Sequence, residues 1–324
     1  MRRWDEQGAA LITVLLLVAV MAVLAVALLD DIRFGIRRAV NANENGQAQW
    51  YALGAEALAK SRIVQLARND GRTSLAGKWP DRAFQYPLDN GRMELRLADG
   101  GACFNLNSVV EGVGEMLQRR DRGAAQFLTL LLALGFSEQQ AAALVGTLVD
   151  WIDSDMLREP AGAEDEVYVN ASLVRRTAAT LMAEASELRA LQGVTEPVYR
   201  QLRPFVCALP TTDLTRINAN TLPPDRAVLL TAVTDGRLLP ADAMRLIALR
   251  PAEGWRDVTA LRAAPPAAAI GGAGGLGEQV SLTTRFFHLE ADVRYGDGEV
   301  LSSSLFEKNG FEVRLVSRRW GAEE

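Results

Sequence analysis

The longest hydrophobic run of the chain covers residues 9–29, a stretch without charge, proline or glycine in which Thr13 is the only polar side chain. A helix of this length rises about 1.5 Å per residue and can cross a hydrocarbon core of roughly 30 Å. A cleavable secretory signal would have a shorter apolar region, closed by an A-x-A site before a polar mature start, whereas this run stays apolar until Asp30 and Asp31. The pattern therefore predicts a membrane-spanning helix at residues 9–29.

A helical pattern continues from residue 32 to about residue 68 without proline, until an Asn-Asp-Gly sequence at residues 69–71 supplies a stop signal. The second half of this segment mixes polar residues with apolar ones such as Trp50 and Leu58. This mixture favours a helix that packs one face against a sheet. We therefore expect one long helix, with its first half in lipid and its second half on a globular domain.

Strand patterns occur early and late in the rest of the chain. Alternating or apolar runs predict strands at residues 93–97, 284–295, 300–306 and 311–317. The late runs are separated by Gly-Asp-Gly and Lys-Asn-Gly sequences, which are typical of hairpin turns. An antiparallel meander is therefore predicted.

Between the early strand and the late meander, the sequence is almost wholly helical in character. Helices are expected at residues 126–134, 139–152, 178–191 and 225–233. Strands interrupted by helices of this extent indicate an α+β fold with a large all-α insertion. We assign residues 30–102 and 283–324 to the α+β domain. The inserted helical domain takes residues 103–282, including a flexible return linker with Pro265-Pro266 and the glycine-rich residues 271–277.

Composition and charge narrow the classes of function. The chain has 324 residues, 49% of them hydrophobic, a formal net charge of -5 and no basic tract, so nucleic acid is not an expected partner. The only histidine, His288, lies in an alternating strand, and no nucleophile has a base near it in sequence. We therefore expect a protein that is not an enzyme.

The N-terminus carries a more specific signal. Arg2 and Arg3 precede the span, so the positive-inside tendency predicts a cytoplasmic N-terminus and places the bulk of the chain across the membrane. Gly8 stands immediately before the apolar run. The short basic segment that ends in this glycine resembles the leader of a type IV prepilin. The resemblance implies that residues 1–8 are a leader, that prepilin peptidase cuts between Gly8 and Ala9, and that the new N-terminus is methylated.

Two departures from the prepilin pattern point to one branch of the family. Most members begin with phenylalanine and carry glutamate at the fifth mature position, whereas this chain has Ala9 and Thr13 there. The K-type minor pseudopilin of type II secretion lacks that glutamate. Segments that resemble its recurrent motifs occur in its order: Phe104-Asn105-Leu106-Asn107, residues 150–155, residues 162–168 and residues 217–224.

Membership of that family implies a type IV pilin-like fold and a place at the tip of a periplasmic fibre. The implied role is to help initiate fibre assembly and to export folded proteins across the outer membrane. The implied partners are I- and J-type and also H-type pseudopilins, prepilin peptidase, secreted substrates and the outer-membrane channel. The implied location is the bacterial inner membrane, with a single pass and a periplasmic bulk.

The densest group of carboxylates lies at residues 150–166, where glycine and proline separate its two halves. Hard cations such as calcium take six to eight oxygen ligands, which such a region can supply. The spacing does not match an EF-hand, and a solvated acidic loop is the alternative. Because K-type pseudopilins resemble calcium-binding proteins here, we expect calcium, with Asp153, Asp155, Glu164 and Asp165 as its ligands.

Cys103 and Cys207 are the only cysteines. Both follow the predicted span and so lie in an oxidising compartment if the predicted orientation holds, which favours a disulfide between them. Two buried free thiols far apart are the alternative, because the sequence gives no distance.

A competing hypothesis comes from residues 188–202, where Gly193-Val194 separates two short helical patterns. This segment resembles a helix-hairpin-helix unit, which often binds DNA phosphates. A membrane-anchored DNA-binding protein of the competence type is therefore the alternative function. The net negative charge makes a packing or protein-binding use of this hairpin the favoured interpretation.

Overall fold

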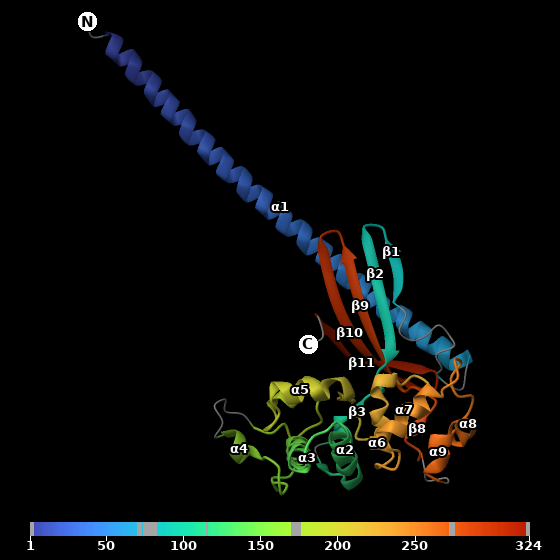
Figure 1. The fold of residues 1–324 in the computed structure, drawn as a ribbon. Helices are drawn as coiled ribbons and strands as arrows, with labels where there is room; N and C mark the ends of the chain where they lie inside the picture. The colour runs from blue at the N-terminus through green and yellow to red at the C-terminus, as the bar shows by residue number, and fades with distance from the viewer. Residues whose placement is uncertain are drawn as a thin grey trace.

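A computed structural model describes residues 3–69, 73, 83–114, 116–169, 176–271 and 276–321 of the protein. One helix, α1 (Arg3–Asn69), extends as a rod from the N-terminus to the globular part of the molecule (Figure 1). Among the described residues it is the single helix long and apolar enough to cross a membrane. Met1 and Arg2 of the predicted leader lie outside the described residues.

The second half of α1 packs on the sheet through small side chains. The residues it buries recur at helical spacing: Ala48, Ala52, Ala55, Ala59 and Ile63. Alanines at the contact bring the helix backbone close to the strands. Facing them are apolar side chains of the sheet, such as Leu95, Leu289 and Val293. The predicted long helix, with one face on a sheet, is confirmed.

The sheet has five antiparallel strands in the order β1-β2-β9-β10-β11. Their bounds are β1 (Phe84–Leu88), β2 (Gly91–Asp99), β9 (Phe286–Tyr295), β10 (Gly298–Asn309) and β11 (Glu312–Trp320). The hairpin turns contain Gly296 and Gly310, both at positive φ. The predicted meander is therefore present. The sequence pattern missed β1, an edge strand that contains Pro87, which an edge tolerates because one side of the strand makes no ladder bonds.

A partly buried ion pair fixes α1 to β10 and β11. The Glu56 carboxylate accepts hydrogen bonds from Arg318 Nε and Nη2, each at 2.6 Å, and from the Ser304 hydroxyl at 2.7 Å. Burial by itself would raise the pKa of Glu56, but these donors hold that pKa below its ordinary value. The contact joins α1, β10 and β11, and it gives Ser304 a structural role.

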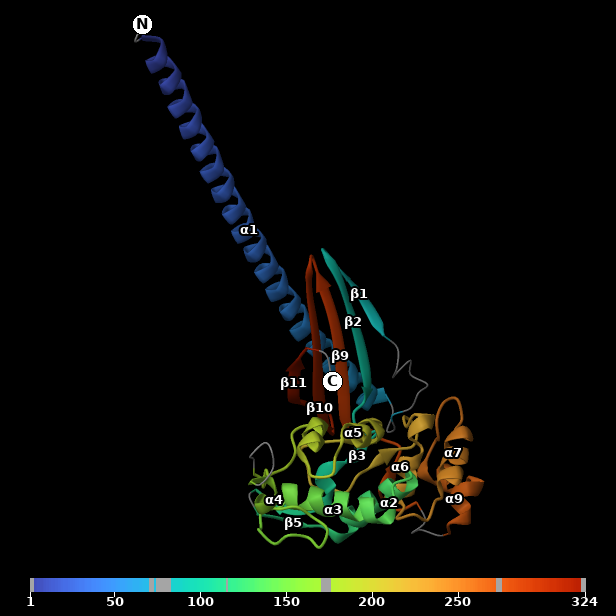
Figure 2. The same ribbon diagram turned by 60° about the vertical axis from the view of Figure 1, so that its left-hand side comes forward.

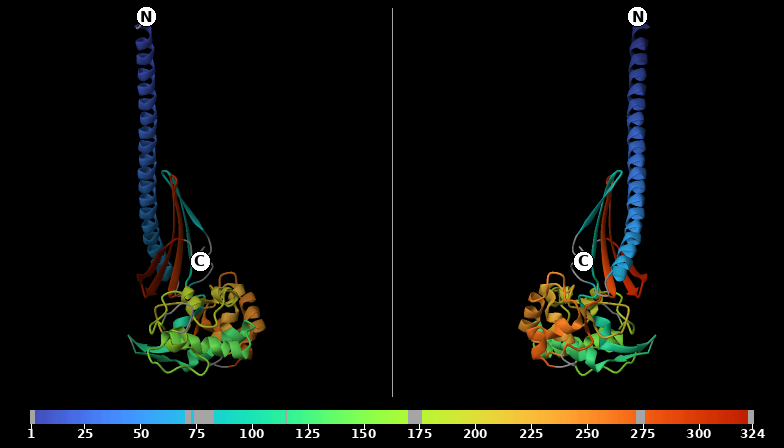
Figure 3. Two further views of the ribbon diagram at one scale, coloured as in Figure 1. Left: turned by 90° about the vertical axis from the view of Figure 1, so that its left-hand side faces the viewer. Right: turned by 90° about the vertical axis from the view of Figure 1, so that its right-hand side faces the viewer.

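The insertion between β2 and β9 has its own hydrophobic core, which runs from Ala102 to Leu282. Its α-helices are α2 (Asp121–Ala133), α3 (Glu138–Ile152), α4 (Asp165–Val169), α5 (Glu196–Leu202), α6 (Val228–Val233), α7 (Pro240–Ala248), α8 (Val258–Ala263) and α9 (Pro265–Ala269). Its 3₁₀ turns are η2 (Leu106–Val109), η3 (Ala185–Ala190), η4 (Arg203–Phe205) and η5 (Pro224–Arg226). Figures 2 and 3 show the insertion at the end of the sheet that lies away from the N-terminus of α1.

The insertion also holds short strands that the helical pattern did not indicate. These are the antiparallel hairpin of β4 (Val110–Val113) with β5 (Met116–Arg119), and two parallel pairs, β3 (Phe104–Asn105) with β6 (Val206–Cys207) and β7 (Ile217–Asn218) with β8 (Val280–Ser281). The α+β class is confirmed. Helices dominate the regular structure of the insertion, but loops and these short strands take a large share of its residues, so it is not wholly helical.

The helix expected at residues 178–191 is wrong, because only η3 forms there. Tertiary partners take the backbone amides that a helix would need. The Ala178 and Ala179 N–H groups donate to the Trp151 carbonyl, and the Met182 N–H donates to Asn107 Oδ1 at 2.8 Å. Ala179 also has a φ of 48°.

The Pro265-Pro266 pair is the first turn of α9 instead of a flexible linker, and Pro266 is buried. Proline suits this position because the first helical N–H groups have no acceptor in the helix. Residues 272–275 of the expected glycine-rich linker lie outside the described residues.

A buried carboxylate ties the insertion to the sheet. Asp99, at the end of β2, accepts hydrogen bonds from the Thr221 hydroxyl, the Thr284 hydroxyl at 2.7 Å and the Gly101 N–H at 2.8 Å. Burial raises the pKa of Asp99. Thr221 belongs to the insertion and Thr284 to the segment that returns to β9, so one side chain holds three parts of the chain together.

Candidate metal centre

The acidic group forms where α3 ends and the chain turns back toward α4. A capping box of Ser137 and Gln140 starts α3, and Asp153 is the residue that ends it. Asp153 and Glu164 are buried, with only 4% and 7% of their surfaces exposed, whereas Asp155 is exposed. A loop of about ten residues brings these carboxylates, distant in the chain, to one place.

The structure brings together three of the four predicted ligands. One oxygen atom each from Asp153, Asp155 and Glu164 lies within 4.8 Å of the others. Asp153 Oδ1 and Glu164 Oε1 are buried, and no described residue donates a hydrogen bond to either of them. Buried carboxylate oxygens without donors are costly, and a hard cation at this point would satisfy them.

Burial and mutual repulsion perturb the acidity of the group. Burial, followed by the charges of Asp155, Asp150 and Glu164, raises the pKa of Asp153 to about 7. Burial and the Asp150 charge also raise the pKa of Glu164. Like charges held together in this way favour either protonation or a bound cation. The three carboxylates together offer oxygen ligands of the kind that hard cations take.

Asp165 is not brought into this group. Its Oδ1 accepts hydrogen bonds from the Thr177 N–H at 2.8 Å and hydroxyl at 3.0 Å. Asp165 also starts α4, where a carboxylate is favoured by the helix dipole. Of the four predicted ligands, Asp165 is therefore the one whose carboxylate lies outside the group.

Asp150, which the predicted ligand set omitted, lies beside the group, and its charge acts on Asp153 and Glu164. Its Oδ1 accepts from the Glu159 N–H at 3.0 Å, and the Ala163 N–H also bonds this carboxylate. Burial raises its pKa. The sequence did hold a signal, because Asp150 precedes Asp153 by three residues and so shares a face of α3.

Two glycines allow the loop to lie against α3. A Cβ on Gly162 would stand 2.0 Å from Asp150 Oδ2, and one on Gly146 would stand 2.9 Å from the Gly162 nitrogen. The loop is also anchored to the β4–β5 hairpin, because the Ser154 N–H donates to the Leu117 carbonyl at 2.9 Å. The glycine and serine positions therefore set the shape of the acidic group.

The predicted disulfide is present in the structure. Cys103 and Cys207 are bonded, with a Cα–Cα distance of 5.7 Å and a sequence separation of 104. The parallel pairing of β3 with β6, in which Asn105 faces Cys207, brings the two cysteines together. The bond thereby clips the middle of the insertion to its first strand.

The segment at residues 188–202, which resembles a helix-hairpin-helix unit, consists of the end of η3, a turn with Gly193 at a φ of 83°, and α5. The Gln192 N–H in this turn donates to the Tyr168 hydroxyl at 3.2 Å. Glu196 forms ion pairs with Arg189 and Arg200. These contacts give the hairpin a packing role, and nothing in its geometry favours the DNA-binding alternative.

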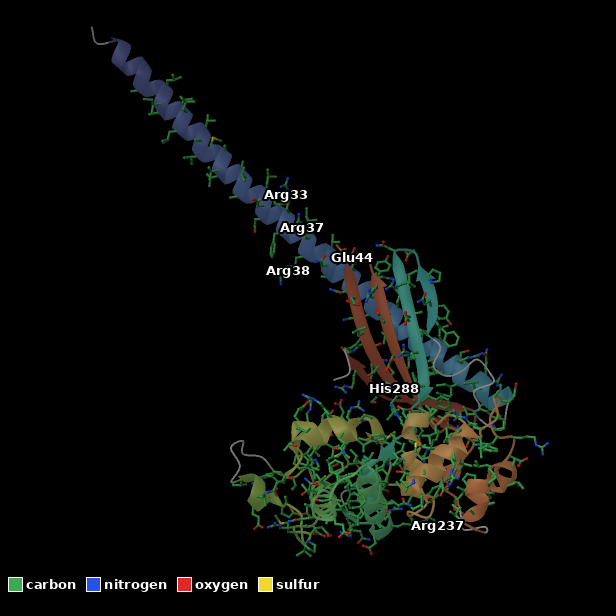
Figure 4. All side chains as sticks on the ribbon, in the orientation of Figure 1. Arg33, Arg37, Arg38, Glu44, Arg237 and His288 are labelled. Atoms are coloured by element: carbon green, nitrogen blue, oxygen red, sulfur yellow. A yellow bond between two sulfur atoms is a disulfide. The ribbon has the colours of Figure 1, made fainter. Side chains whose placement is uncertain are left out.

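The asparagine pairs of the predicted motifs bond buried backbone. Asn107 bonds both the N–H and the carbonyl of Met182, and Asn220 does the same for Trp255. His288 lies half-buried in β9, with its Nδ1 3.9 Å from a Glu290 oxygen (Figure 4). These residues have structural roles.

Comparison with known proteins agrees with this architecture. Two family profiles described as Type II secretion system (T2SS), protein K, match residues 102–211 and 217–283. The type II secretion system protein K of Pectobacterium carotovorum subsp. carotovorum is 34% identical over 326 residues, covering 98% of each chain. That of Klebsiella pneumoniae is 34% identical over 319 residues, covering 98% of this chain and 97% of its own.

The fold has a solved counterpart as well. A chain in the crystal structure of the GspK-GspI-GspJ complex from the enterotoxigenic Escherichia coli type 2 secretion system matches with a TM-score of 0.77 and 30% identity. The match covers 88% of this chain and 100% of that one. With the sequence matches extending over nearly its whole length, the chain belongs to the type II secretion system protein K family.

Proposed function

We propose that this minor pseudopilin stands at the tip of the type II secretion pseudopilus, where it helps to initiate fibre assembly and the export of folded proteins across the outer membrane. The observation that carries the proposal is the position of the insertion. It covers the end of the sheet that faces away from the N-terminus of α1 (Figure 3). A bulky domain there would obstruct the addition of a further subunit beyond this one.

The chemistry at the start of α1 supports the same position. The Thr13 hydroxyl donates to the Ala10 carbonyl of its own helix at 2.8 Å. Threonine has no carboxylate, so this position cannot neutralise the N-terminal amine of another subunit within the bilayer. A charged amine in lipid needs such a partner, so a subunit without the carboxylate suits a place with no neighbour above it.

The location follows from the same proposal. The apolar part of α1 would cross the inner membrane once, with the N-terminus in the cytoplasm and the globular part in the periplasm. There it would contact I- and J-type pseudopilins, and also an H-type subunit, the secreted substrates and the outer-membrane channel. The GspK-GspI-GspJ complex that contains the structural counterpart supports the first two partners.

We also propose a calcium ion at the acidic group, held by Asp153, Asp155 and Glu164. The two buried carboxylate oxygens without hydrogen-bond donors support this ion. A bound cation would supply charge neutralisation, and it would fix the loop after α3 in one conformation. The ion would have a structural role.

Co-purification tests the tip assignment. We expect the full-length protein, extracted in detergent, to form a stoichiometric complex with I- and J-type pseudopilins, and fibres to be lost when the protein is absent. Crosslinks from an engineered cysteine in the insertion should reach no further pilin-like subunit. Crosslinks from the insertion to the helix of another pseudopilin would contradict the tip position.

Processing tests the predicted leader. We expect the mature chain to begin at Ala9, because a short basic leader ends at Gly8 before an uninterrupted apolar helix. Gly8→Val should block the cut, whereas Gly35→Val, in the same helix and with open space around it, should leave it unchanged. Intact-mass analysis of membrane-extracted protein decides the question, and a wild-type chain that begins at Met1 in cells with active peptidase would contradict it.

A further inference from the structure

Between the apolar span and the sheet, α1 has a segment that touches nothing else in the described part of the chain. Every residue from 30 to 43 is exposed. The first contact with the globular part comes at Glu44, whose Oε2 accepts a hydrogen bond from the Asp297 N–H at 2.9 Å. At about 1.5 Å per residue, this exposed segment spans about 20 Å beyond the end of the apolar run.

The exposed segment carries three arginines, Arg33, Arg37 and Arg38, which Figure 4 shows along α1 above the sheet. Arg33 lies 3.9 Å from Asp30, and both side chains are at least 70% exposed, so this ion pair is weak. No described residue forms an ion pair with Arg37 or Arg38. Glu44, the next acidic residue along the helix, already bonds the turn at Asp297.

Apolar side chains share the segment with the arginines. Ile32, Ile36 and Val40 recur every four residues and are 56%, 58% and 46% exposed. They form a stripe on one side of the helix, with Arg33 and Arg37 along its border. This stripe continues the apolar surface past Asp30 and Asp31, as expected of a helix that leaves a bilayer through its headgroup layer.

The direction of the helix turns these side chains toward the membrane. In an α-helix the Cα–Cβ bonds tilt toward the N-terminus, which here is the end in the bilayer. Long arginine side chains extend further in that direction and place their guanidinium groups at the headgroup level. Guanidinium groups bind phosphate oxygens in a bidentate manner.

The orientation of the chain gives no other reason for these charges. Arginines that follow a span on its far side work against the positive-inside tendency, and aspartates such as Asp30 and Asp31 contribute little to that balance. Only Arg2 and Arg3 precede the span, and both would be lost with the leader. Since membrane orientation does not require Arg33, Arg37 and Arg38, an anionic ligand on the side of the membrane where they lie would explain their presence.

We propose that Arg33, Arg37 and Arg38 form a binding site for the phosphate groups of anionic phospholipids, on the membrane surface that the globular domain faces. The site would hold α1 at a fixed depth before the subunit joins a fibre. The proposal rests on the membrane anchorage proposed above.

The test uses detergent-extracted full-length protein titrated with phosphatidylglycerol or phosphatidylcholine, with bound lipids counted by native mass spectrometry. Arg37→Gln/Arg38→Gln should weaken phosphatidylglycerol binding about 30-fold, at about fivefold for each arginine near a lipid surface. Phosphatidylcholine binding should change little. The matched control, Arg68→Gln/Arg262→Gln, removes the same charge at two exposed positions away from the span and should bind like wild type.

Unchanged phosphatidylglycerol binding by the double variant would overturn the proposal. If lipid binding is unchanged while recovery with I- and J-type partners falls, the arginines face carboxylates of a neighbouring subunit, and the lipid assignment is wrong. Failure of the anchorage itself is distinguishable, because the wild-type protein would then leave the membrane fraction without detergent.

Discussion

Opening the disulfide between Cys103 and Cys207 is expected to lower the free energy of unfolding by about 4 to 5 kcal/mol, because it releases a closed loop of about 100 residues in the unfolded chain. The bond joins the first strand of the insertion to β6. Chemical denaturation of the oxidised and the reduced protein measures the difference.

The double variant Cys103→Ala/Cys207→Ala should behave like the reduced wild type, since both lack the cross-link and keep small side chains at the buried Cys103 and half-buried Cys207 positions. Reductant should not change the variant further. The chain-entropy argument fails if oxidised and reduced wild-type protein unfold at the same denaturant concentration. Two free thiols in the denatured, unreduced protein would contradict the bond itself.

At a calcium concentration one hundred times the dissociation constant, we expect the insertion to be about 3 kcal/mol more stable than after calcium is removed by a chelator. The reason is the repulsion among Asp153, Asp155 and Glu164, which have no cation between them after chelation. Calorimetry with and without a chelator measures the loss, and titration of the chelated protein measures the binding. An identical transition in both conditions, with no heat of binding, would show that the group is a solvated loop.

Two single variants separate ligands from neighbours. Asp153→Asn should abolish most of the binding, because it removes a buried carboxylate to whose Oδ1 no residue in the described part of the chain donates. Asp165→Asn is the matched control: the amide oxygen can still accept from Thr177, so calcium affinity should stay close to wild type. A larger loss with Asp165→Asn than with Asp153→Asn would restore the ligand set expected from sequence.

The pH dependence of the site has a definite sign. With the pKa of Asp153 raised to about 7, its protonated form is favoured in the folded, metal-free protein. That stability is fully present below the ordinary pKa of an aspartate and is lost as pH rises through about 7. Calcium competes with this proton, so its affinity should be about 30-fold weaker at about pH 5.5 than at about pH 8.

The sequence by itself determined the parts of this protein that depend on local pattern. The apolar run at residues 9–29 requires a helix in lipid, because backbone groups there have no other partner. Alternation and hairpin turns around Gly296 and Gly310 determined the late strands, since side chains in a strand change face at every residue. Motif order identified the family. The span and the strands are read from neighbouring residues, and each motif is a short segment that can be recognised by itself.

The tertiary structure alone decided which distant groups meet. It brought Asp153, Asp155 and Glu164 together and left Asp165 with Thr177. In the first part of the helix expected at residues 178–191, backbone N–H groups bond Trp151 and Asn107 instead. Sequence spacing cannot supply these outcomes, because a carboxylate or an amide takes whichever partner the packed core brings within about 3 Å. Which partner comes within reach depends on contacts between segments many residues apart. One such contact is the close approach of Gly146 to Gly162, which shapes the acidic loop.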